Sequence, residues 1–160
     1  MKFSSQEEYG LRCLIRIGKS SSPNGLTIPE ISQLEGLSEA HVGKILRILR
    51  LGSFVESSRG QTGGYKLSRP ANKIIIGEVL SVLGGKLFES GFCENHSGVE
   101  TICTHTIDCS VRSLWSIIQN LLDGVLSKTT LQNLLGSEEE TKTIAINISD
   151  EVEIPKISSN

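Results

Sequence analysis

Apolar residues recur every three or four positions through the first third of the chain, which is the spacing of a helix with one buried face. The spacing predicts a first helix over residues 5–19, a short second helix over 28–34 and a third helix that runs to about Leu51. Gly36 is placed to end the second helix, and Ser38 is placed to cap the third. Two short helices joined by so tight a turn are typical of a helix-turn-helix.

The pattern changes after Leu51 from helical spacing to that of a β-hairpin. Residues 54–56 have the composition of a strand, RGQTGG at 59–64 is a Gly-rich turn, and 65–68 form a return strand that Pro70 closes. A helix-turn-helix followed at once by a hairpin with a basic tip is a winged helix. The predicted fold class is therefore mainly α, with a small β-hairpin wing.

The second half of the chain contains one strongly amphipathic segment, residues 110–126. Its apolar stripe is wider than one small winged helix can cover, which predicts a dimerisation helix, with a simple core helix as the alternative. The predicted organisation has four parts: a winged helix-turn-helix domain (1–83, with a fourth helix within 74–83), a cysteine-bearing sensor loop (84–109), a dimerisation helix with a short C-terminal helix (110–135), and an acidic, flexible tail (136–160), mostly unstructured, with at most a weak strand.

Charge is distributed unevenly along the chain, whose net charge is −2. Residues 1–80 hold eleven Lys and Arg against seven Asp and Glu, whereas residues 81–160 hold five against eleven. Within 41–73, seven basic residues accompany one acid, Glu56. A basic patch joined to an acidic remainder indicates a nucleic-acid surface attached to something else, and a chance cluster on a solvated face is the alternative.

Several classes of protein are disfavoured by what the sequence lacks. The N-terminus has no apolar run of a signal peptide, and no stretch reaches the roughly 18 apolar residues that span a bilayer, so we expect a soluble cytoplasmic protein with no membrane partner. There is no phosphate-binding glycine fingerprint and no Ser/His/Asp arrangement. We therefore expect no enzymatic activity and no small-molecule substrate.

In a winged helix the third helix enters the major groove of double-stranded DNA, where side chains reach base edges. Lys44 can donate to guanine or phosphate, while Arg47 and Arg50 are better placed for the phosphate backbone. A solvated surface charge is the alternative for Lys44 and Arg47, and also for Arg59. At the wing, Arg59 is placed to enter the minor groove, and the glycines let the main chain approach closely. The candidate DNA-binding residues are Ser38, Ala40, His41, Gly43, Lys44, Arg47, Arg50, Arg59 and Gly60.

Three of the four cysteines fall close together, as Cys93, Cys103 and Cys109, while Cys13 stands alone in the first helix as a small apolar residue. Without a secretory signal, metal or redox chemistry is favoured over a disulfide framework. The pattern C-x9-C-x5-C lacks the C-x2-C pair typical of structural zinc sites. Thiolates bind iron–sulfur clusters, zinc or copper(I), and the spacing alone leaves an iron–sulfur cluster, zinc and free thiols open.

Taken together, these motifs resemble the Rrf-two family of bacterial transcription regulators, which includes IscR, NsrR and RirA. The resemblance runs from Met1 to about Leu135 and rests on EEYGLR, RGQTGGYKLSRP, IIIGEVLSVL and the three-cysteine loop leading into Leu114-Trp115. It implies a homodimeric winged helix that binds a DNA operator as a repressor. It also implies a [2Fe–2S] or [4Fe–4S] cluster held by Cys93, Cys103 and Cys109, and a minor-groove role for Arg59.

The resemblance leaves two features unsettled. IscR-like members have a histidine three residues after the last cysteine, where this chain has Arg112, which is no ligand. NsrR-like members use a carboxylate of the partner subunit's first helix, which implies Glu8 as the fourth ligand, with His105 and Asp108 as runners-up. Some relatives have a glutamate at the place of Gly43, so the operator sequence does not carry over. The alternative sensor is a cluster-free thiol switch or a zinc site at the same cysteines.

Overall fold

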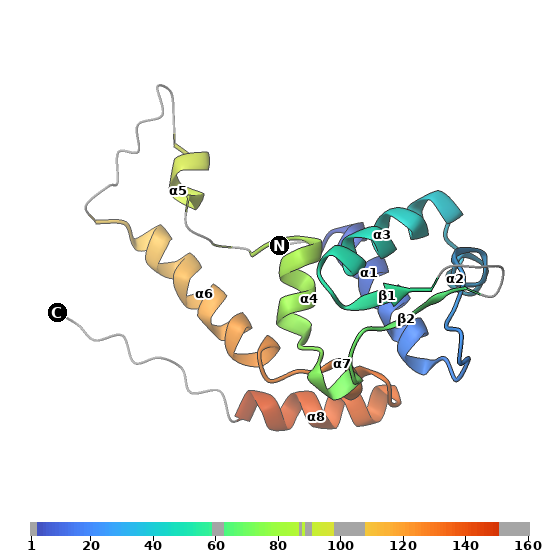
Figure 1. The fold of residues 1–160 in the computed structure, drawn as a ribbon. Helices are drawn as coiled ribbons and strands as arrows, with labels where there is room; N and C mark the ends of the chain where they lie inside the picture. The colour runs from blue at the N-terminus through green and yellow to red at the C-terminus, as the bar shows by residue number, and fades with distance from the viewer. Residues whose placement is uncertain (1–2, 59–62, 87, 89–90, 98–107, 151–160) are drawn as a thin grey trace.

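A computed structural model describes residues 3–58, 63–86, 88, 91–97 and 108–150 of the chain. Figure 1 shows α1 to α4 gathered with a two-stranded hairpin, and α6 leading away from α4 on the opposite side. The elements are α1 (Ser5–Lys19), α2 (Ile28–Glu35), α3 (Glu39–Leu51), β1 (Val55–Ser57), β2 (Tyr65–Leu67), the 3-10 helix η1 (Ala71–Lys73), α4 (Ile76–Leu83), α5 (Phe92–Asn95), α6 (Ser110–Leu126), α7 (Leu131–Leu134) and α8 (Glu138–Asp150).

Local capping fixes where the first helices begin and end. Ser4 and Glu7 form a reciprocal capping box at the start of α1, and Thr27 and Glu30 form one at the start of α2. Gly36 ends α2 with a φ of 67°, a left-handed conformation that favours glycine. The turn between α2 and α3 is therefore specified by its own residues, as the sequence predicts.

The hydrophobic core lies between α1, α3 and α4, and Phe54, directly before β1, closes it from the side of the wing together with Val55 of β1. Fully buried side chains come from each of these elements, so the helix-turn-helix and the wing share one core: Leu14 on α1, Ile45, Leu46 and Leu49 on α3, Val79 on α4 and Val55 on β1. This shared core holds α3 in a fixed orientation relative to the wing.

The wing is a two-stranded antiparallel hairpin in which Val55 pairs with Leu67. Each strand differs from its predicted bounds by one residue. An isolated bridge between Leu26 and Tyr65 adds a short third pairing that the sequence did not predict. Gly64 allows it, because a Cβ there would lie 2.8 Å from the carbonyl oxygen of Asn24.

The C-terminal part of the chain folds back onto the winged helix through α7. The amide of Ile76 donates to the carbonyl of Thr129 at 2.9 Å, and the amide of Leu131 donates to the carbonyl of Ile74 at 2.8 Å. Leu131 is fully buried in the shared core. These bonds fix the C-terminal end of α6 beside the start of α4.

The predicted unstructured tail is wrong for residues 138–150, which form α8. The alternation of Ile144, Ile146 and Ile148 suggests a strand, but neither strand described is paired with this segment. Ser137 and Glu140 instead cap a helix reciprocally: the amide of Ser137 donates to the Glu140 carboxylate at 2.7 Å, and the amide of Glu140 donates to the Ser137 hydroxyl at 3.2 Å.

Candidate DNA-binding surface and cysteine site

The recognition helix α3 presents its polar face away from the core. Ser38, Ala40, Lys44, Arg47 and Arg50 are exposed, and the Ser38 hydroxyl accepts a 3.3 Å hydrogen bond from the amide of His41. The Arg50 guanidinium donates to the Ser57 hydroxyl of β1 at 3.3 Å, which ties the C-terminal end of α3 to the wing. The exposed basic side chains thus lie along one continuous face of the helix.

Two predicted contact residues of α3 are half-buried and touch other elements. The ring of His41 meets the ring of Tyr9 on α1 edge to face, with centroids 5.4 Å apart. A Cβ at Gly43 would lie 3.7 Å from Ile28 of α2, which is an ordinary contact, so the packing here does not require glycine. His41 is therefore a packing partner of α1 as well as a candidate DNA contact.

One buried carboxylate joins α1 to the helix-turn-helix. Glu35 has a side chain only 6% exposed, and its two oxygens accept from Arg12 at 2.9 Å and from Arg16 at 2.7 Å. Arg12 also donates to the main-chain carbonyl of Glu35 at 2.9 Å. The hydrogen bond to Glu35, together with the nearby charges of Glu35 and Glu8, raises the pKa of Arg12 above its ordinary value.

Sequence reasoning missed this network, because its partners lie 19 and 23 residues apart. The available signal was weak: two arginines four residues apart on α1, and one acid directly before the turn glycine Gly36.

The wing tip carries two further candidates, Arg59 and Gly60, which lie outside the described residues. Directly beside them, Gly64 donates its amide to the Ser58 hydroxyl at 3.2 Å and accepts from the amide of Ser58 at 3.0 Å. These two bonds close the base of the hairpin and so bring both ends of the wing tip together.

Two of the three loop cysteines are described, one on a short helix and one directly before a helix. Cys93 is half-buried on α5, and Cys109 is half-buried at the N-cap of α6, where its sulfur accepts a 3.3 Å hydrogen bond from the amide of Arg112. Neither is in a disulfide. Cys103 and His105 lie outside the described residues. Within the described ranges, no three His, Cys, Asp or Glu side chains are grouped closely enough to hold a metal ion.

Two further ligand candidates, Glu8 and Asp108, are among the described residues. Glu8 is exposed on α1. Asp108 is exposed directly before Cys109, and both line a small pocket of about 150 Å³. Cys13 is fully buried in the core, and this burial raises the pKa of its thiol to about 11. Cys13 is thus the least reactive of the described thiols toward reagents in water.

The start of the segment 84–109, which the sequence predicts to be a sensor loop, is held against α6 by a chain of polar side chains. Lys86 forms a 2.9 Å ion pair with Asp123, whose other oxygen accepts from the Gln119 amide at 2.9 Å. The side-chain carbonyl of Gln119 in turn accepts from the amide of Phe88 at 3.0 Å. Gln119 is buried, so this chain fixes the loop entrance to the middle of α6.

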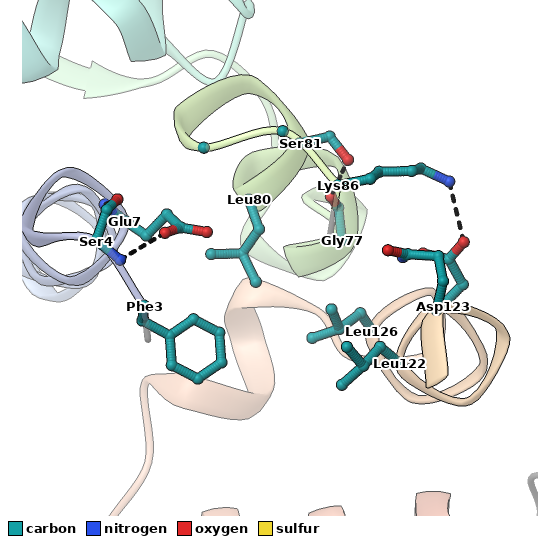
Figure 2. A pocket seen from close by; sticks show the side chains of 13 residues that line it. Phe3, Ser4, Glu7, Gly77, Leu80, Ser81, Lys86, Leu122, Asp123 and Leu126 are labelled. Carbon is teal, nitrogen blue, oxygen red and sulfur yellow. Dashed lines mark hydrogen bonds and ion pairs between the residues drawn. The ribbon is translucent and has the colours of Figure 1, made fainter. Parts of the chain in front are cut away.

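A groove of about 340 Å³ lies between the N-terminus of α1, the end of α4 and the inner side of α6. Figure 2 shows Phe3, Leu80, Leu122 and Leu126 directed into it, with the ion pair of Lys86 and Asp123 at its edge. Phe3 is 71% exposed, so the described residues leave its side chain largely uncovered.

On α6, the apolar side chains nearest the N-terminal end are also uncovered. Val111 is 58% exposed, Leu114 52% and Trp115 38%. In the parts of the chain that the structure covers, no helix is long and apolar enough to cross a membrane.

Comparison with known proteins identifies the family. Residues 3–137 match the family model Rrf2, described as an iron-dependent transcriptional regulator. The chain is 27% identical over 139 residues to the HTH-type transcriptional regulator IscR of Escherichia coli O1:K1, covering 87% of this chain and 83% of that protein. Both the family model and this relative are thus described as transcription regulators.

Solved structures agree with the fold. CymR, the global cysteine regulator of Bacillus subtilis, has a TM-score of 0.66 at 30% identity, covering 84% of this chain and 96% of that one. The oxidised form of Staphylococcus aureus CymR has a TM-score of 0.64 at 26% identity, covering 86% and 98%. IscR of T. potens, at 23% identity, shares the fold with a TM-score of 0.65, covering 100% of this chain and 94% of that one. The chain therefore belongs to the Rrf2 family of winged-helix, DNA-binding transcription regulators.

Proposed function

We propose that this protein is a homodimeric repressor whose affinity for its DNA operator is controlled by an iron–sulfur cluster held by Cys93, Cys103 and Cys109. The observation that carries the proposal is the placement of thiols at both ends of one loop, with Cys109 capping the helix α6. The same chain carries an exposed basic recognition helix. The thiols of the loop and the DNA-binding helix thus belong to the same molecule, so a chemical change at the loop can affect DNA binding.

DNA contact is proposed for α3 and the wing. Lys44 and Arg47 lie exposed on α3, and Arg50 is exposed where α3 meets the wing. The N-terminus of α3 is capped by Ser38, and its free amides favour a phosphate. Arg59 and Gly60 are proposed to reach the minor groove from the wing tip, and Ala40, His41 and Gly43 to face the bases from α3.

A second copy of the chain is the proposed occupant of the groove beside α6. Apolar side chains at Val111, Leu114 and Trp115 would otherwise remain in water, and the groove that Phe3 and Leu122 line continues beside the same helix. A twofold arrangement would bury both surfaces at once and place two recognition helices side by side.

The donor set of the loop fits an iron–sulfur cluster. Cys93 and Cys109 are free thiols, and the amide hydrogen bond to the Cys109 sulfur is of the kind that tunes such clusters. When bound, the cluster would supply a centre that responds to iron, to redox state or to nitric oxide. Each of these responses would change how the three sulfurs are bound. For the fourth ligand, Glu8 of the partner subunit, which the resemblance implies, is one candidate.

The residues of this chain provide a route from the loop to the recognition helix. Phe88 and Lys86 tie the loop entrance to α6. On α1, Glu8 lies beside Arg12, and Arg12 holds the carboxylate of Glu35 at the turn before α3. A ligand bond to Glu8 would thus pull on the helix that positions α3. The route becomes a switch only if DNA binds two states differently.

The cluster is tested by spectroscopy of protein purified without oxygen. It should absorb in the visible, and Cys93→Ala, Cys103→Ala and Cys109→Ala should each abolish that absorption, whereas Cys13→Ala should retain it. The affinity for a DNA fragment selected from random sequence should differ between the cluster-bound and the cluster-free protein. A colourless wild-type protein that contains one zinc per chain would overturn the proposal that an iron–sulfur cluster is the sensor.

DNA reading is tested on the same fragment with Lys44→Ala. Loss of one base or phosphate contact should weaken binding by roughly 1–3 kcal/mol. Lys19→Ala is the matched control, because Lys19 is an exposed lysine at the far end of α1. Equal affinity for the Lys44 variant and wild type would remove α3 from the interface.

The second candidate keeps the DNA-binding dimer but makes the cysteines a cluster-free thiol switch or a zinc site. The similarity to CymR, solved in an oxidised form, favours the thiol switch. In that case, mild oxidation of colourless protein should change DNA affinity, and Cys93→Ala should abolish the change.

A further inference from the structure

Arg69 lies where the wing returns to the core, two residues after β2 ends at Leu67. Its guanidinium donates from three nitrogens to three separate segments. Nη1 donates to the main-chain carbonyl of Ser53 at 2.9 Å, and Nε donates to that of Lys73 at 3.0 Å. Nη2 forms a 3.2 Å ion pair with Glu78 of α4. One side chain thus joins the end of the wing to the turn between α3 and β1, to η1 and to α4.

The same guanidinium covers an aromatic ring of the core. Cζ of Arg69 lies 5.1 Å from the centroid of the Phe54 ring, which is within the range of a cation–π contact. Phe54 is 2% exposed, and its amide donates to the carbonyl of Leu49 on α3 at 2.9 Å. A planar guanidinium can lie against a ring while its nitrogens donate to acceptors around it. A lysine ammonium, a single point of charge, has no such fork.

The turn that Arg69 holds is strained. Ser53 has a φ of 60°, a left-handed conformation that residues other than glycine rarely adopt. Its carbonyl accepts from the hydroxyl of Ser68 as well as from Arg69, and the amide of Ser68 donates to the carbonyl of Phe54 at 3.1 Å. Such a conformation persists only where the surrounding structure fixes it. The direction in which the chain leaves α3 and enters β1 therefore depends on these bonds.

That direction sets where the strands of the wing lie relative to α3. In the proposed interface, α3 enters the major groove and the wing reaches the minor groove beside it. A wing already held at the right angle binds more tightly than one that must be ordered on the DNA, because ordering costs free energy of binding.

We propose that Arg69 is a positioning residue for DNA binding, which fixes the strands of the wing relative to α3 without contacting DNA itself. Three of its nitrogens are already bound to acceptors of the protein. The inference rests on the proposed DNA interface and adds to it a residue that acts from behind the contact surface.

The experiment compares two chemical footprints of the full-length protein on a DNA fragment that the wild type selects from random sequence. Dimethyl sulfate methylates guanine N7 in the major groove, and hydroxyl radicals attack the sugars that border the minor groove. Arg69→Lys keeps the charge but cannot meet both carbonyls at once. Glu78→Gln is the matched control, because it removes only an ion pair whose carboxylate side chain is 58% exposed.

Wild type should protect both grooves. Arg69→Lys should keep the major-groove protection and lose the minor-groove protection, and its affinity should fall about tenfold, the size of one lost DNA contact. Glu78→Gln should match wild type in both grooves. Arg69→Lys should also lower the unfolding temperature. Adding Ser53→Gly, which relieves the strained turn, should recover that temperature without recovering the minor-groove protection.

The results that would overturn the inference are distinguishable from failure of the interface. Unchanged footprints in Arg69→Lys, an equal loss in both grooves, or minor-groove protection that returns with stability in the double variant would each remove Arg69 as a positioning residue and leave the interface intact. A wild type that protects neither groove, or only the major groove, removes both proposals.

Discussion

At the scale of single residues, Cys13 and Cys109 show how one side chain acquires opposite properties from its surroundings. Cys13 is fully enclosed by the core, where a charged sulfur has no solvation. Cys109 is half-buried at the start of a helix, where an amide donates to its sulfur. The first is suited to packing and the second to binding a metal or reacting.

The raised pKa of Cys13 predicts a specific dependence of stability on pH. Burial raises it from the ordinary 9.0 to about 11, so the unfolded chain loses this proton before the folded chain does. The contribution is complete below about pH 9 and is lost as the pH rises toward 11, a total of about 2–3 kcal/mol at 1.36 kcal/mol per pH unit.

Urea unfolding between pH 8 and 11 measures this effect. Cys13→Ala should be less stable than wild type at pH 8, because it leaves a small cavity. Its stability should then fall less steeply with pH than that of wild type. Parallel curves for the two proteins would contradict the assignment.

At the scale of elements, the connection between α1 and the helix-turn-helix depends on one carboxylate. Glu35→Gln removes the charge that both Arg12 and Arg16 contact. Hydrogen bonds to charged groups are worth about 1.5–3 kcal/mol, and we expect a loss of that size. Thermal unfolding with Glu56→Gln as control tests it, because Glu56 pairs with Lys66 on the surface, where both side chains are more than half exposed. Equal effects of the two substitutions on thermal stability would show that burial adds nothing to the stabilisation by the Glu35 ion pairs.

The elements that sequence alone predicts are those with strong local signals. The predicted bounds of α1 and α6 match the structure, because each is long, amphipathic and clearly capped. The 3-10 helix Ala71–Lys73 and the bridge between Leu26 and Tyr65 were not predicted, since each depends on where the chain meets distant residues. The tail was misread because β-branched residues favour a strand only where another strand can pair with them.

The candidate site also has one part that local sequence signals predict and another part that they do not. The exposed basic face of α3 follows from helical spacing around the buried Val42, Ile45 and Leu46, so sequence was enough to predict it. The Glu35 network depends on contacts in space, because Arg12 and Arg16 lie 23 and 19 residues away from Glu35 along the chain.

At the scale of the whole molecule, assembly should depend on the uncovered end of α6. Leu114→Glu would place a charge in the proposed interface, while in the single chain this side chain is 52% exposed. Sedimentation should therefore show wild type as a dimer and the variant as a folded monomer with an unchanged helical spectrum. Leu51→Glu is the control, since Leu51 is 70% exposed on α3. A monomeric wild type at micromolar concentration would rule out the dimer.

The cap that Cys109 provides to α6 has a consequence for how its variants are interpreted. Its sulfur satisfies one of the amides that every helix leaves free at its first turn. Cys109→Ala would remove a proposed ligand and a cap together, so the first turn of α6 should be destabilised by the roughly 0.5–2 kcal/mol typical of a lost cap, whereas Cys93→Ala removes no cap. Cys109→Ser would keep a side chain that can cap the helix while removing the thiol. Comparing the two variants therefore separates the effect of losing the cap from the effect of losing the sulfur.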